Sequence, residues 1–282
     1  MKTEIIYEDK DLLVIRKPAG LATQTARVGQ ADVVSELKNY IAASGTAEPP
    51  YLGIIHRLDQ PVEGLLVFAK NRKTAAALTK QLGGQGEDCT LNKRYYAVLC
   101  GKPSEKEGEL VDYIYKDMQK TGKAVIIENY TEDSGNDGGK GSVNAKDSRK
   151  KHGGNTVDPG DGRGKPEAPA GSRSGITPKK AVLQYRILQT VRTTSGEDIS
   201  LADIRIETGR FHQIRAQMAH AGMALLGDDK YADEAVKACS RGLGIRTVAL
   251  CAGSIAFVQP VTGERLHFET RPRSKAFSFF EL

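Results

Sequence analysis

Short apolar runs, each bounded by turn-forming residues, recur along most of this chain and are the feature that most constrains its fold. Near the N-terminus the runs 5–7 and 12–15 flank a polar turn, and Pro18 and Gly20 follow the second run. Two such runs joined by a short turn predict a β-hairpin. A similar pattern around the turn 261–264 predicts another hairpin near the C-terminus.

Two capped helices are predicted among further strands. Asp32 can cap a helix over 33–43, and Asn71 can cap a second helix that starts at 72. Further strands are predicted at 93–101, 181–191, 200–208 and 248–260. Because helices and strands mix without strict βαβ alternation, the pattern favours an α+β fold over a doubly wound sheet.

The segment 131–178 differs in composition from the rest of the chain. It contains eleven glycines and no Phe, Trp or Tyr, and its eight Lys and Arg nearly balance its seven Asp and Glu. Such a segment cannot bury enough apolar surface to offset its ordering entropy. We therefore predict a disordered insertion in a single catalytic domain spanning 1–282. An inert solvated loop is favoured over an arm that tethers RNA.

Composition excludes several classes of protein. With 39% hydrophobic and 27% charged residues, the 282-residue chain is typical of a soluble globular protein. It has no apolar run of the roughly 20 residues that a membrane span needs. Its first residues include acids where a signal peptide would have an uninterrupted apolar stretch, so we expect no signal peptide. Its four cysteines form no C-x-x-C pair and its five histidines are scattered, so we expect no metal site and a cytoplasmic location. The net charge of +6 leans weakly toward an anionic partner.

A charged group interrupts two apolar runs in the stretch GIIHRLDQPVEGLLVFAK. Arg57 and Asp59 lie there between the predicted strands 54–55 and 65–68. A carboxylate at the end of a buried strand loses hydration, so it requires a partner, a shifted pKa or a chemical task. A structural aspartate that caps the turn or pairs with Arg57 is the alternative.

Two other stretches combine charged and aromatic residues. In ETGRFHQIRAQM a helix is predicted from about Phe211, with His212 and Arg215 on one face. Its predicted core-facing stripe consists of Phe211, Ile214 and Met218. As an alternative, the arginines of this stretch could simply bind phosphate near a helix N-terminus. The second stretch is the predicted strand NKRYYAVLCG, whose two tyrosines could simply pack on opposite faces of a sheet.

Taken in order, three motifs resemble those of the RluA-type family of RNA pseudouridine synthases. They read HRLD…GLLVFAK, K-x-Y-x-A-V-x-x-G and TGR-x-HQIR…GD-x-x-Y. The two terminal hairpins are also similar to those of that family, so the resemblance covers about 3–271 without the insertion. It implies a mixed, mostly antiparallel central sheet flanked by helices and loops, with an active-site cleft across the sheet.

The resemblance also implies catalytic residues. Asp59 matches the catalytic aspartate, Tyr95 the active-site tyrosine, and Arg215 the arginine whose charge favours the carboxylate. Asp59 is expected to act as a nucleophile, on either the base or the sugar. Tyr95 could stack under the base or transfer a proton. No cofactor or metal is implied.

RNA is the implied partner, either ribosomal or transfer RNA. We expect Arg57 to face the RNA backbone, and Arg210 or His212 to help hold the extruded uridine. The candidate RNA-binding residues are Arg57, Lys93, Arg210, His212 and Gln213. Because the first hairpin starts at residue 3, no separate N-terminal RNA-binding domain is expected, and we expect a monomer without membrane association.

Two adjacent positions depart from the family pattern, and two other functions compete. Val62 and Glu63 stand where the family usually has Thr-Ser, which puts a negative charge near the expected RNA path. The first alternative is a non-catalytic RNA-binding or ribosome-assembly factor on the same fold. The second is a metal-dependent nuclease that uses His56, Asp59 and His212, although a two-metal site normally needs more acids.

Overall fold

The computed structural model describes the chain except for residues 28, 44–49, 84–90, 118–120, 129 and 131–176. The predicted insertion therefore lies outside the described residues, apart from 177 and 178 just before a strand. The strands in the described residues are β1 (Glu4–Glu8), β2 (Leu12–Lys17), β3 (Gly53–Ile54), β4 (Glu63–Ala69), β5 (Asn92–Cys100), β6 (Glu107–Lys116), β7 (Ala124–Ile127), β8 (Lys179–Arg192), β9 (Asp198–Ile206), β10 (Leu250–Val258) and β11 (Arg265–Glu269). The helices in these residues are α1 (Val33–Ala42), α2 (Arg72–Gly83), α3 (Gln213–His220), α4 (Glu234–Gly242) and the short 3₁₀-helix η2 (Lys275–Phe279).

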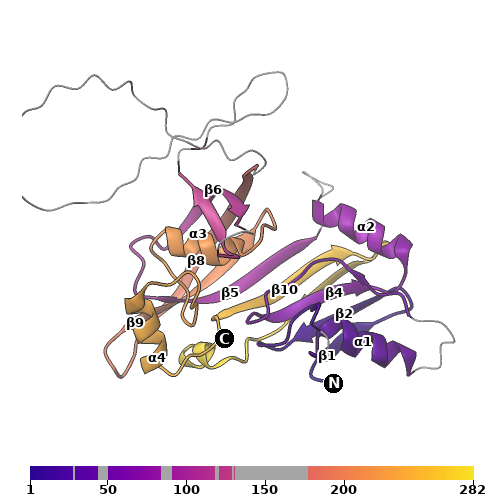
Figure 1. Ribbon diagram of the computed structural model, residues 1–282, viewed down its shortest axis with the longest axis horizontal. Helices are drawn as coiled ribbons and strands as arrows, with labels where there is room; N and C mark the ends of the chain where they lie inside the picture. The colour runs from indigo at the N-terminus through magenta and orange to yellow at the C-terminus, as the bar shows by residue number, and fades with distance from the viewer. Residues whose placement is uncertain (28, 44–49, 84–90, 118–120, 129, 131–176) are drawn as a thin grey trace, which may run out of the picture.

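The described strands form one long sheet, shown in Figure 1, with the order β1-β2-β4-β10-β5-β9-β8-β6-β7. Strand β11 pairs with β10, and β3 pairs with β4. All of these pairs are antiparallel except β4 with β10. The predicted α+β fold with a mixed, mostly antiparallel sheet is confirmed.

Both predicted hairpins and both predicted helix caps are present. Strands β1 and β2 form the first hairpin, and β10 and β11 form the last. The side chain of Asp32 accepts a hydrogen bond from the amide of Ser35 at 2.7 Å, and that of Asn71 accepts one from Thr74 at 2.8 Å. Each cap satisfies an amide that would otherwise lack a partner in the first helical turn.

Continuous apolar runs in β2 and β4 place buried side chains on both faces of the sheet. Helices α1 and α3 pack on one face, against a cluster that includes Leu66, Phe68 and Ile204. Helix α2 packs on the other face of β4, through Leu78 beside Leu65. Helix α4 and η2 join a third cluster with alternate residues of β5 and β9. The sheet is therefore buried on both faces over much of its length.

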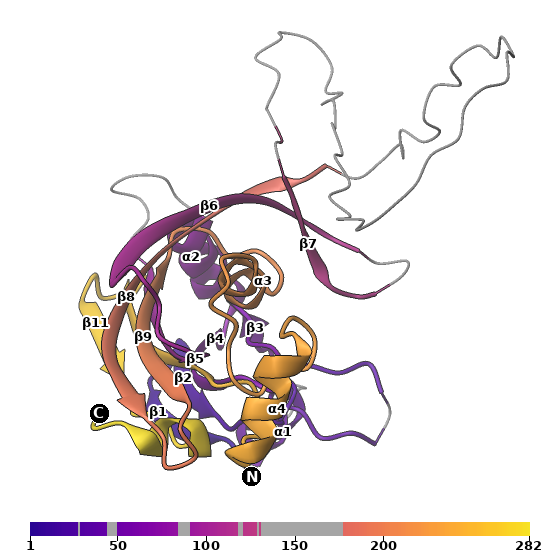
Figure 2. The same cartoon turned by 90° about the vertical axis from the view of Figure 1, so that its left-hand side faces the viewer.

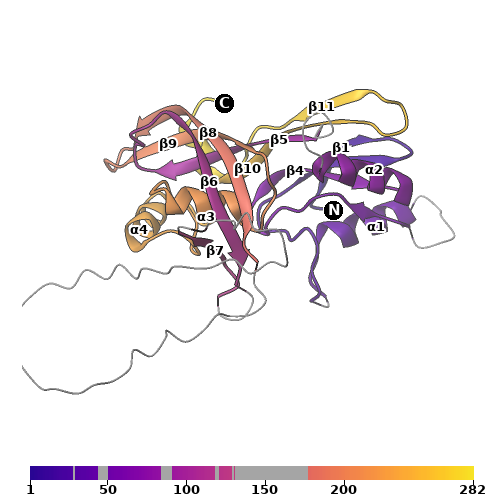
Figure 3. The ribbon, with the colours of Figure 1, turned by 90° about the horizontal axis from the view of Figure 1, so that it is seen from above.

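Strands β6, β7 and β8 form an arm at one end of the sheet, which Figure 2 shows curling around α3. The sequence analysis did not predict β6, β7 or α4. Strand β7 contacts α3, so the arm closes one side of that helix. In Figure 3, α1, α3 and α4 lie lower in the picture than β5, β9 and β11.

Helix α3 begins two residues later than predicted. His212 is its N-cap residue, in the left-handed region at φ 52° and ψ 25°. Ile214 and Met218 are buried as predicted, but the prediction was wrong for Phe211, which is 37% exposed. The left-handed residue breaks the helical periodicity between Phe211 and the helix, so Phe211 does not continue the buried stripe.

Candidate active site

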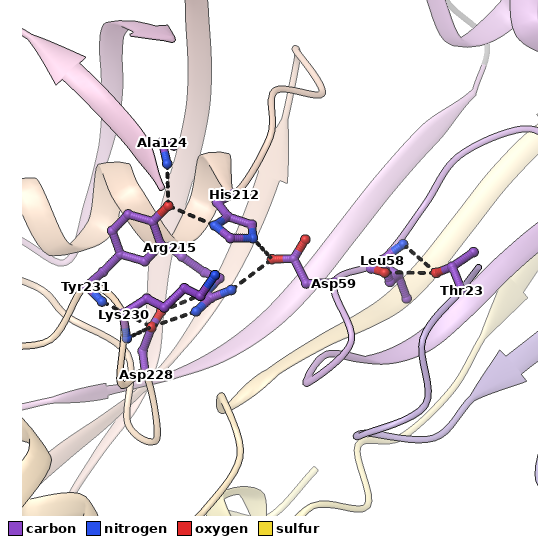
Figure 4. A network of polar contacts seen from close by, with 9 residues as sticks. All are labelled: Thr23, Leu58, Asp59, Ala124, His212, Arg215, Asp228, Lys230 and Tyr231. Atoms are coloured by element: carbon purple, nitrogen blue, oxygen red, sulfur yellow. Dashed lines mark hydrogen bonds and ion pairs between the residues drawn. The ribbon is translucent and has the colours of Figure 1, made fainter. Parts of the chain in front are cut away.

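The loop that carries Asp59 connects β3 to β4 and is held by the segment after β2. The amide of Leu58 donates to Oγ1 of Thr23 at 3.2 Å, and this hydroxyl donates to the carbonyl of Leu58 at 2.8 Å (Figure 4). The amide of Val62 closes a turn on the carbonyl of Asp59 at 3.0 Å. The backbone around Asp59 is thus fixed by contacts on both sides.

A buried lysine strengthens this loop. The ammonium of Lys17 donates to the carbonyls of Pro18, Leu21 and Gln60 at 3.0, 2.7 and 3.1 Å. Burial lowers the pKa of Lys17 to about 8, although the charge of Asp59 opposes this shift. Lys17 is fully buried, so its three acceptors replace the water that the ammonium loses.

Asp59 and Arg215 lie in contact, as the resemblance implied. Nη1 of Arg215 donates to Oδ2 of Asp59 at 3.0 Å. Nε and Nη2 of the same guanidinium donate to the two carboxylate oxygens of Asp228, each at 2.7 Å. Burial alone would lower the pKa of Arg215, but its pairs with Asp228 and Asp59 raise it. The guanidinium is therefore a fixed positive charge beside Asp59.

His212 also reaches Asp59, from the left-handed position before α3. Its Nε2 lies 3.4 Å from Oδ2 of Asp59, and its Nδ1 lies 2.8 Å from the hydroxyl of Tyr231 (Figure 4). That hydroxyl accepts the amide of Ala124 at 2.6 Å and has one proton that it can donate to Nδ1. Because the carboxylate of Asp59 can only accept, the tautomer of neutral His212 that satisfies both contacts carries its proton on Nε2.

Burial keeps His212 and Tyr231 neutral near pH 7. Burial lowers the pKa of His212 to about 4. The negative charge of Asp59 would raise this pKa, but the positive charges of Arg215 and Lys230 oppose that effect. Burial raises the pKa of Tyr231 to about 12. The hydroxyl of Tyr231 can therefore keep donating to His212 over the whole neutral range.

Tyr95 lies beside Asp59 in a small pocket of about 70 Å³. The pocket is also lined by Arg215, Ile206 and Leu250, so it combines polar candidate catalytic residues with apolar side chains. Tyr95 is only 6% exposed, and burial, then the charge of Asp59, raises its pKa. Its phenol is therefore protonated at neutral pH and can donate a proton or stack.

Next to this pocket lies a cleft of about 980 Å³ whose lining includes Asp59 and Tyr95. Its lining cations are Arg57, Lys93, Lys180, Arg205 and Arg210, against the two carboxylates of Asp59 and Glu207. The excess of positive charge is what an anionic ligand requires. The predicted cleft across the sheet is present, since β5, β8 and β9 all contribute to its lining.

Four of the five candidate RNA-binding residues line this cleft, namely Arg57, Lys93, Arg210 and His212. Arg57 donates to the side chain of Gln24 at 3.1 Å, and Nε of Arg210 donates to the carbonyl of Lys180 at 2.9 Å. Lys93 is mostly buried. Arg57 is exposed and Arg210 is partly buried, so Arg57 is the more accessible of these two cations.

Gln213, the fifth candidate, is only 3% exposed, and its side-chain amide forms hydrogen bonds with other groups of the protein. Its oxygen accepts hydrogen bonds from the hydroxyl of Thr208 and the amide of Arg210, at 2.8 and 3.0 Å. Its nitrogen donates to the carbonyl of Val182 at 3.0 Å. These contacts fix the turn 208–212, which indicates a positioning role for Gln213 rather than contact with RNA.

The expectation for Glu63 was wrong. Its side chain is 4% exposed and accepts hydrogen bonds from the amides of Arg273 and Ser274, at about 3.1 and 2.8 Å. The carboxylate therefore anchors the segment before η2 and does not face the cleft. Val62 is buried as well. Gly64 keeps a left-handed φ of 120°, and a Cβ there would lie 2.4 Å from the carbonyl oxygen of Ala252.

Asp228 and Tyr231 are site residues to which the sequence analysis assigned no role. Both belong to the GD-x-x-Y motif, in a turn where Oδ1 of Asp228 also accepts the amides of Lys230 and Tyr231. A carboxylate followed three residues later by an amphipathic tyrosine was the available signal. The sequence alone could not show that this turn lies against Arg215 and His212.

The described residues contain no group of three or more His, Cys, Asp and Glu side chains placed to hold a metal ion. His56, Asp59 and His212 therefore do not form the site that the nuclease alternative requires. Within the described part of the chain, no helix combines the length and apolar composition needed to cross a membrane.

Solved structures share this fold. Human RNA pseudouridylate synthase domain containing 1 matches 96% of this chain and 83% of its own, with a TM-score of 0.63 and 16% identity. Human RNA pseudouridylate synthase domain containing 4 matches 96% of this chain and 89% of its own, with a TM-score of 0.60 and 22% identity. At these identities the likeness establishes the fold alone.

Sequence comparison identifies the family. Residues 11–220 match the family model described as RNA pseudouridylate synthase. The ribosomal large subunit pseudouridine synthase D of Zymomonas mobilis is 30% identical over 275 residues, which cover 94% of this chain and 68% of that protein. The ribosomal large subunit pseudouridine synthase C of Rickettsia conorii is 26% identical over 257 residues, covering 90% and 65%. The chain therefore belongs to the RluA-type family of RNA pseudouridine synthases, which are isomerases that act on RNA.

Proposed function

We propose that this protein converts a uridine of large-subunit ribosomal RNA to pseudouridine, with Asp59 as the nucleophile. One observation carries the proposal. Oδ2 of Asp59 is held by Arg215 and His212, whereas Oδ1 makes no hydrogen bond to the described residues. Since Asp59 also lines the basic cleft, Oδ1 is the oxygen placed to attack a bound nucleotide.

The reaction rearranges one nucleotide without adding or removing atoms. The bond between N1 of uracil and C1′ of ribose breaks, and a bond between C5 and C1′ forms. The proton displaced from C5 is matched by one gained at N1. Attack by Oδ1 on either the base or the sugar divides this exchange into two easier steps. The reaction changes no oxidation state of the enzyme and transfers no group from a second substrate.

The surrounding residues have complementary roles in this proposal. Arg215 keeps the charge of Asp59 in place, and the neutral imidazole of His212 orients Oδ2 through its Nε2 proton. Tyr95 can donate a proton or stack on the turned base, because its phenol stays protonated in the small pocket. Arg57 and Arg210 bind phosphates beside the extruded uridine.

The choice of ribosomal RNA over transfer RNA rests on the relatives, several of which are named ribosomal large subunit pseudouridine synthases. A ribosomal substrate places the activity in the cytoplasm. All groups proposed for catalysis come from one chain, so we propose that the protein acts as a monomer. Family membership and the combined presence of Asp59, Tyr95 and Arg215 favour catalysis over a non-catalytic RNA-binding role.

The test maps pseudouridine in ribosomal and transfer RNA from cells with and without this gene, then treats the deficient RNA with purified protein. We expect a ribosomal site to be lost in the deficient cells and restored by wild-type protein. Asp59→Asn should bind this RNA and form no product. The matched control is Asp229→Asn, since Asp229 is an exposed aspartate in the neighbouring turn. Product formation by Asp59→Asn would overturn the nucleophile, and a lost site in transfer RNA would overturn the substrate class.

A further inference from the structure

Phe211 is a large apolar side chain exposed at the cleft. It is 37% exposed, and it is among the residues that line the cleft beside Asp59. It occupies the variable position of the motif TGR-x-HQIR, directly before the left-handed His212. A single exposed apolar residue would need no explanation elsewhere on the surface, but here the ring borders the proposed path of RNA.

The ring of Phe211 belongs to a continuous stack that leads to Asp59. Its centroid lies 3.7 Å from that of His212, with 20° between the two planes. His212 meets the ring of Tyr231 edge-on, and its Nε2 lies 3.4 Å from Oδ2 of Asp59. An aromatic surface at Phe211 is therefore separated from the reacting carboxylate by one imidazole ring.

A cation lies over the same ring. Nζ of Lys116, at the end of β6, is 4.3 Å from the centroid of Phe211. Lys116 is exposed, and its long side chain can change rotamer at little cost. A cation over an exposed aromatic ring occupies a position that a flat base could take, while the ammonium moves to a phosphate.

We propose that Phe211 and Lys116 form a nucleobase subsite beside the catalytic pocket. The inference rests on the proposed function. A base that neighbours the target uridine stacks on Phe211, and Lys116 leaves the ring to bind the adjacent phosphate. Every base has a π-face, so the subsite contributes affinity with little dependence on the identity of that base. Phe211 already stacks on His212 without the neighbouring base, so chemistry itself does not require that base.

The experiment measures productive RNA binding separately from the chemical step. Large-subunit ribosomal RNA from cells that lack the gene is converted by excess protein in single-turnover reactions. The protein concentration that gives half the maximal rate reports binding, and the maximal rate reports chemistry. The variants are Phe211→Leu, Phe211→Trp and Lys116→Gln. The matched control is Tyr40→Leu, because Tyr40 is a 39% exposed aromatic residue on α1 that does not line the cleft.

For Phe211→Leu we expect the half-saturating concentration to rise about tenfold, within the range of about fivefold to 150-fold that base stacking supports. Its maximal rate should stay within about twofold of wild type, as a stacking contact outside the reacting atoms implies. Phe211→Trp should bind as tightly as wild type or tighter. Lys116→Gln should reduce the slope of log affinity against log salt by about one, whereas Phe211→Leu should leave it unchanged.

Two results would overturn the subsite. One is a Phe211→Leu protein that binds as tightly as wild type. The other is an equal fall in maximal rate for the Leu and Trp variants, which would show that Phe211 only supports His212. A wild-type protein that forms no pseudouridine would instead refute the proposed function, so the two failures are distinct.

Discussion

Asp228 binds Arg215 through two hydrogen bonds of 2.7 Å and leaves Nη1 of the guanidinium to reach Asp59 at 3.0 Å. The bidentate pair is almost completely buried, whereas Asp59 is 25% exposed on its side chain. The guanidinium of Arg215 therefore binds two carboxylates. The buried carboxylate of Asp228 fixes the orientation of the guanidinium, and the more exposed carboxylate of Asp59 faces the cleft. The plane of the guanidinium, and hence the position of Asp59, depends on Asp228.

This dependence predicts the effect of Asp228→Asn. An amide nitrogen in place of one oxygen faces an N–H of Arg215, so one hydrogen bond and the buried charge pair are lost. We expect the single-turnover rate to fall about a hundredfold while RNA affinity changes little, because Asp59 is misplaced and the cleft is not. The free energy of unfolding should fall by about 3 kcal/mol. Urea denaturation and single-turnover assays measure the two effects, and a rate within twofold of wild type would contradict the positioning role.

Replacement of Arg215 separates orientation from charge. Arg215→Lys keeps a positive charge but cannot reach Asp228 and Asp59 in one plane, so it should recover only part of the rate lost in Arg215→Ala. Both variants should lose more rate than affinity, since the side chain is buried behind Asp59. Single-turnover rates at saturating protein give the comparison. If Arg215→Ala reacts at nearly the wild-type rate, Arg215 has no part in catalysis.

Glu63 provides a prediction on stability. Its buried carboxylate accepts two backbone amides of the segment before η2, and Glu63→Ala would leave both without that acceptor. Hydrogen bonds to a charged acceptor are worth about 1.5 to 3 kcal/mol each, so we expect the free energy of unfolding to fall by about 3 kcal/mol or more. RNA affinity should be unchanged, because the carboxylate faces away from the cleft. Urea denaturation tests this prediction, with Glu264→Ala as the control because Glu264 is an exposed glutamate in the β10–β11 turn. Equal denaturation midpoints for the two variants would contradict the anchoring role of Glu63.

The misplacement of Glu63 shows what the sequence could not resolve. Periodicity and turn residues predicted β1, β2 and both capped helices, because these elements are determined by neighbours in the chain. The burial of Glu63 depends instead on residues 273 and 274, about 210 positions away. No local pattern specifies such a partner, and a charged residue after a turn is most often exposed.

The candidate site was predictable to a similar extent. The motifs that contain Asp59, Tyr95 and Arg215 were recognisable, and the structure brings all three to one pocket. The contact of Arg215 with Asp228 and the left-handed backbone of His212 were not predicted. Both depend on packing between the β6–β8 arm, α3 and the turn after α3, which short-range sequence patterns do not specify.

The last prediction concerns His56, which is part of HRLD and a largely buried part of the cleft lining. Neither ring nitrogen has a hydrogen-bond partner among the described residues, and the residue is only 8% exposed. Burial, with a smaller effect of Lys93, lowers the pKa of His56 from 6.5 to about 3. Between these two pH values the unfolded chain binds a proton that the folded chain does not. The free energy of unfolding is therefore unaffected by His56 above about pH 6.5, and the protonation of His56 in the unfolded chain lowers it progressively as the pH falls toward 3.

We expect His56→Leu to remove this part of the acid sensitivity. From pH 7 to pH 5, wild-type protein should lose about 2 kcal/mol more of its free energy of unfolding than the variant, since one pKa unit corresponds to about 1.4 kcal/mol. At pH 7 the substitution should be nearly neutral, because leucine leaves no buried polar atom unpaired. Urea denaturation at both pH values gives the difference. Since His212 keeps its own lowered pKa in both proteins, its contribution cancels. Parallel loss of stability in the two proteins would show that His56 becomes protonated in the folded state.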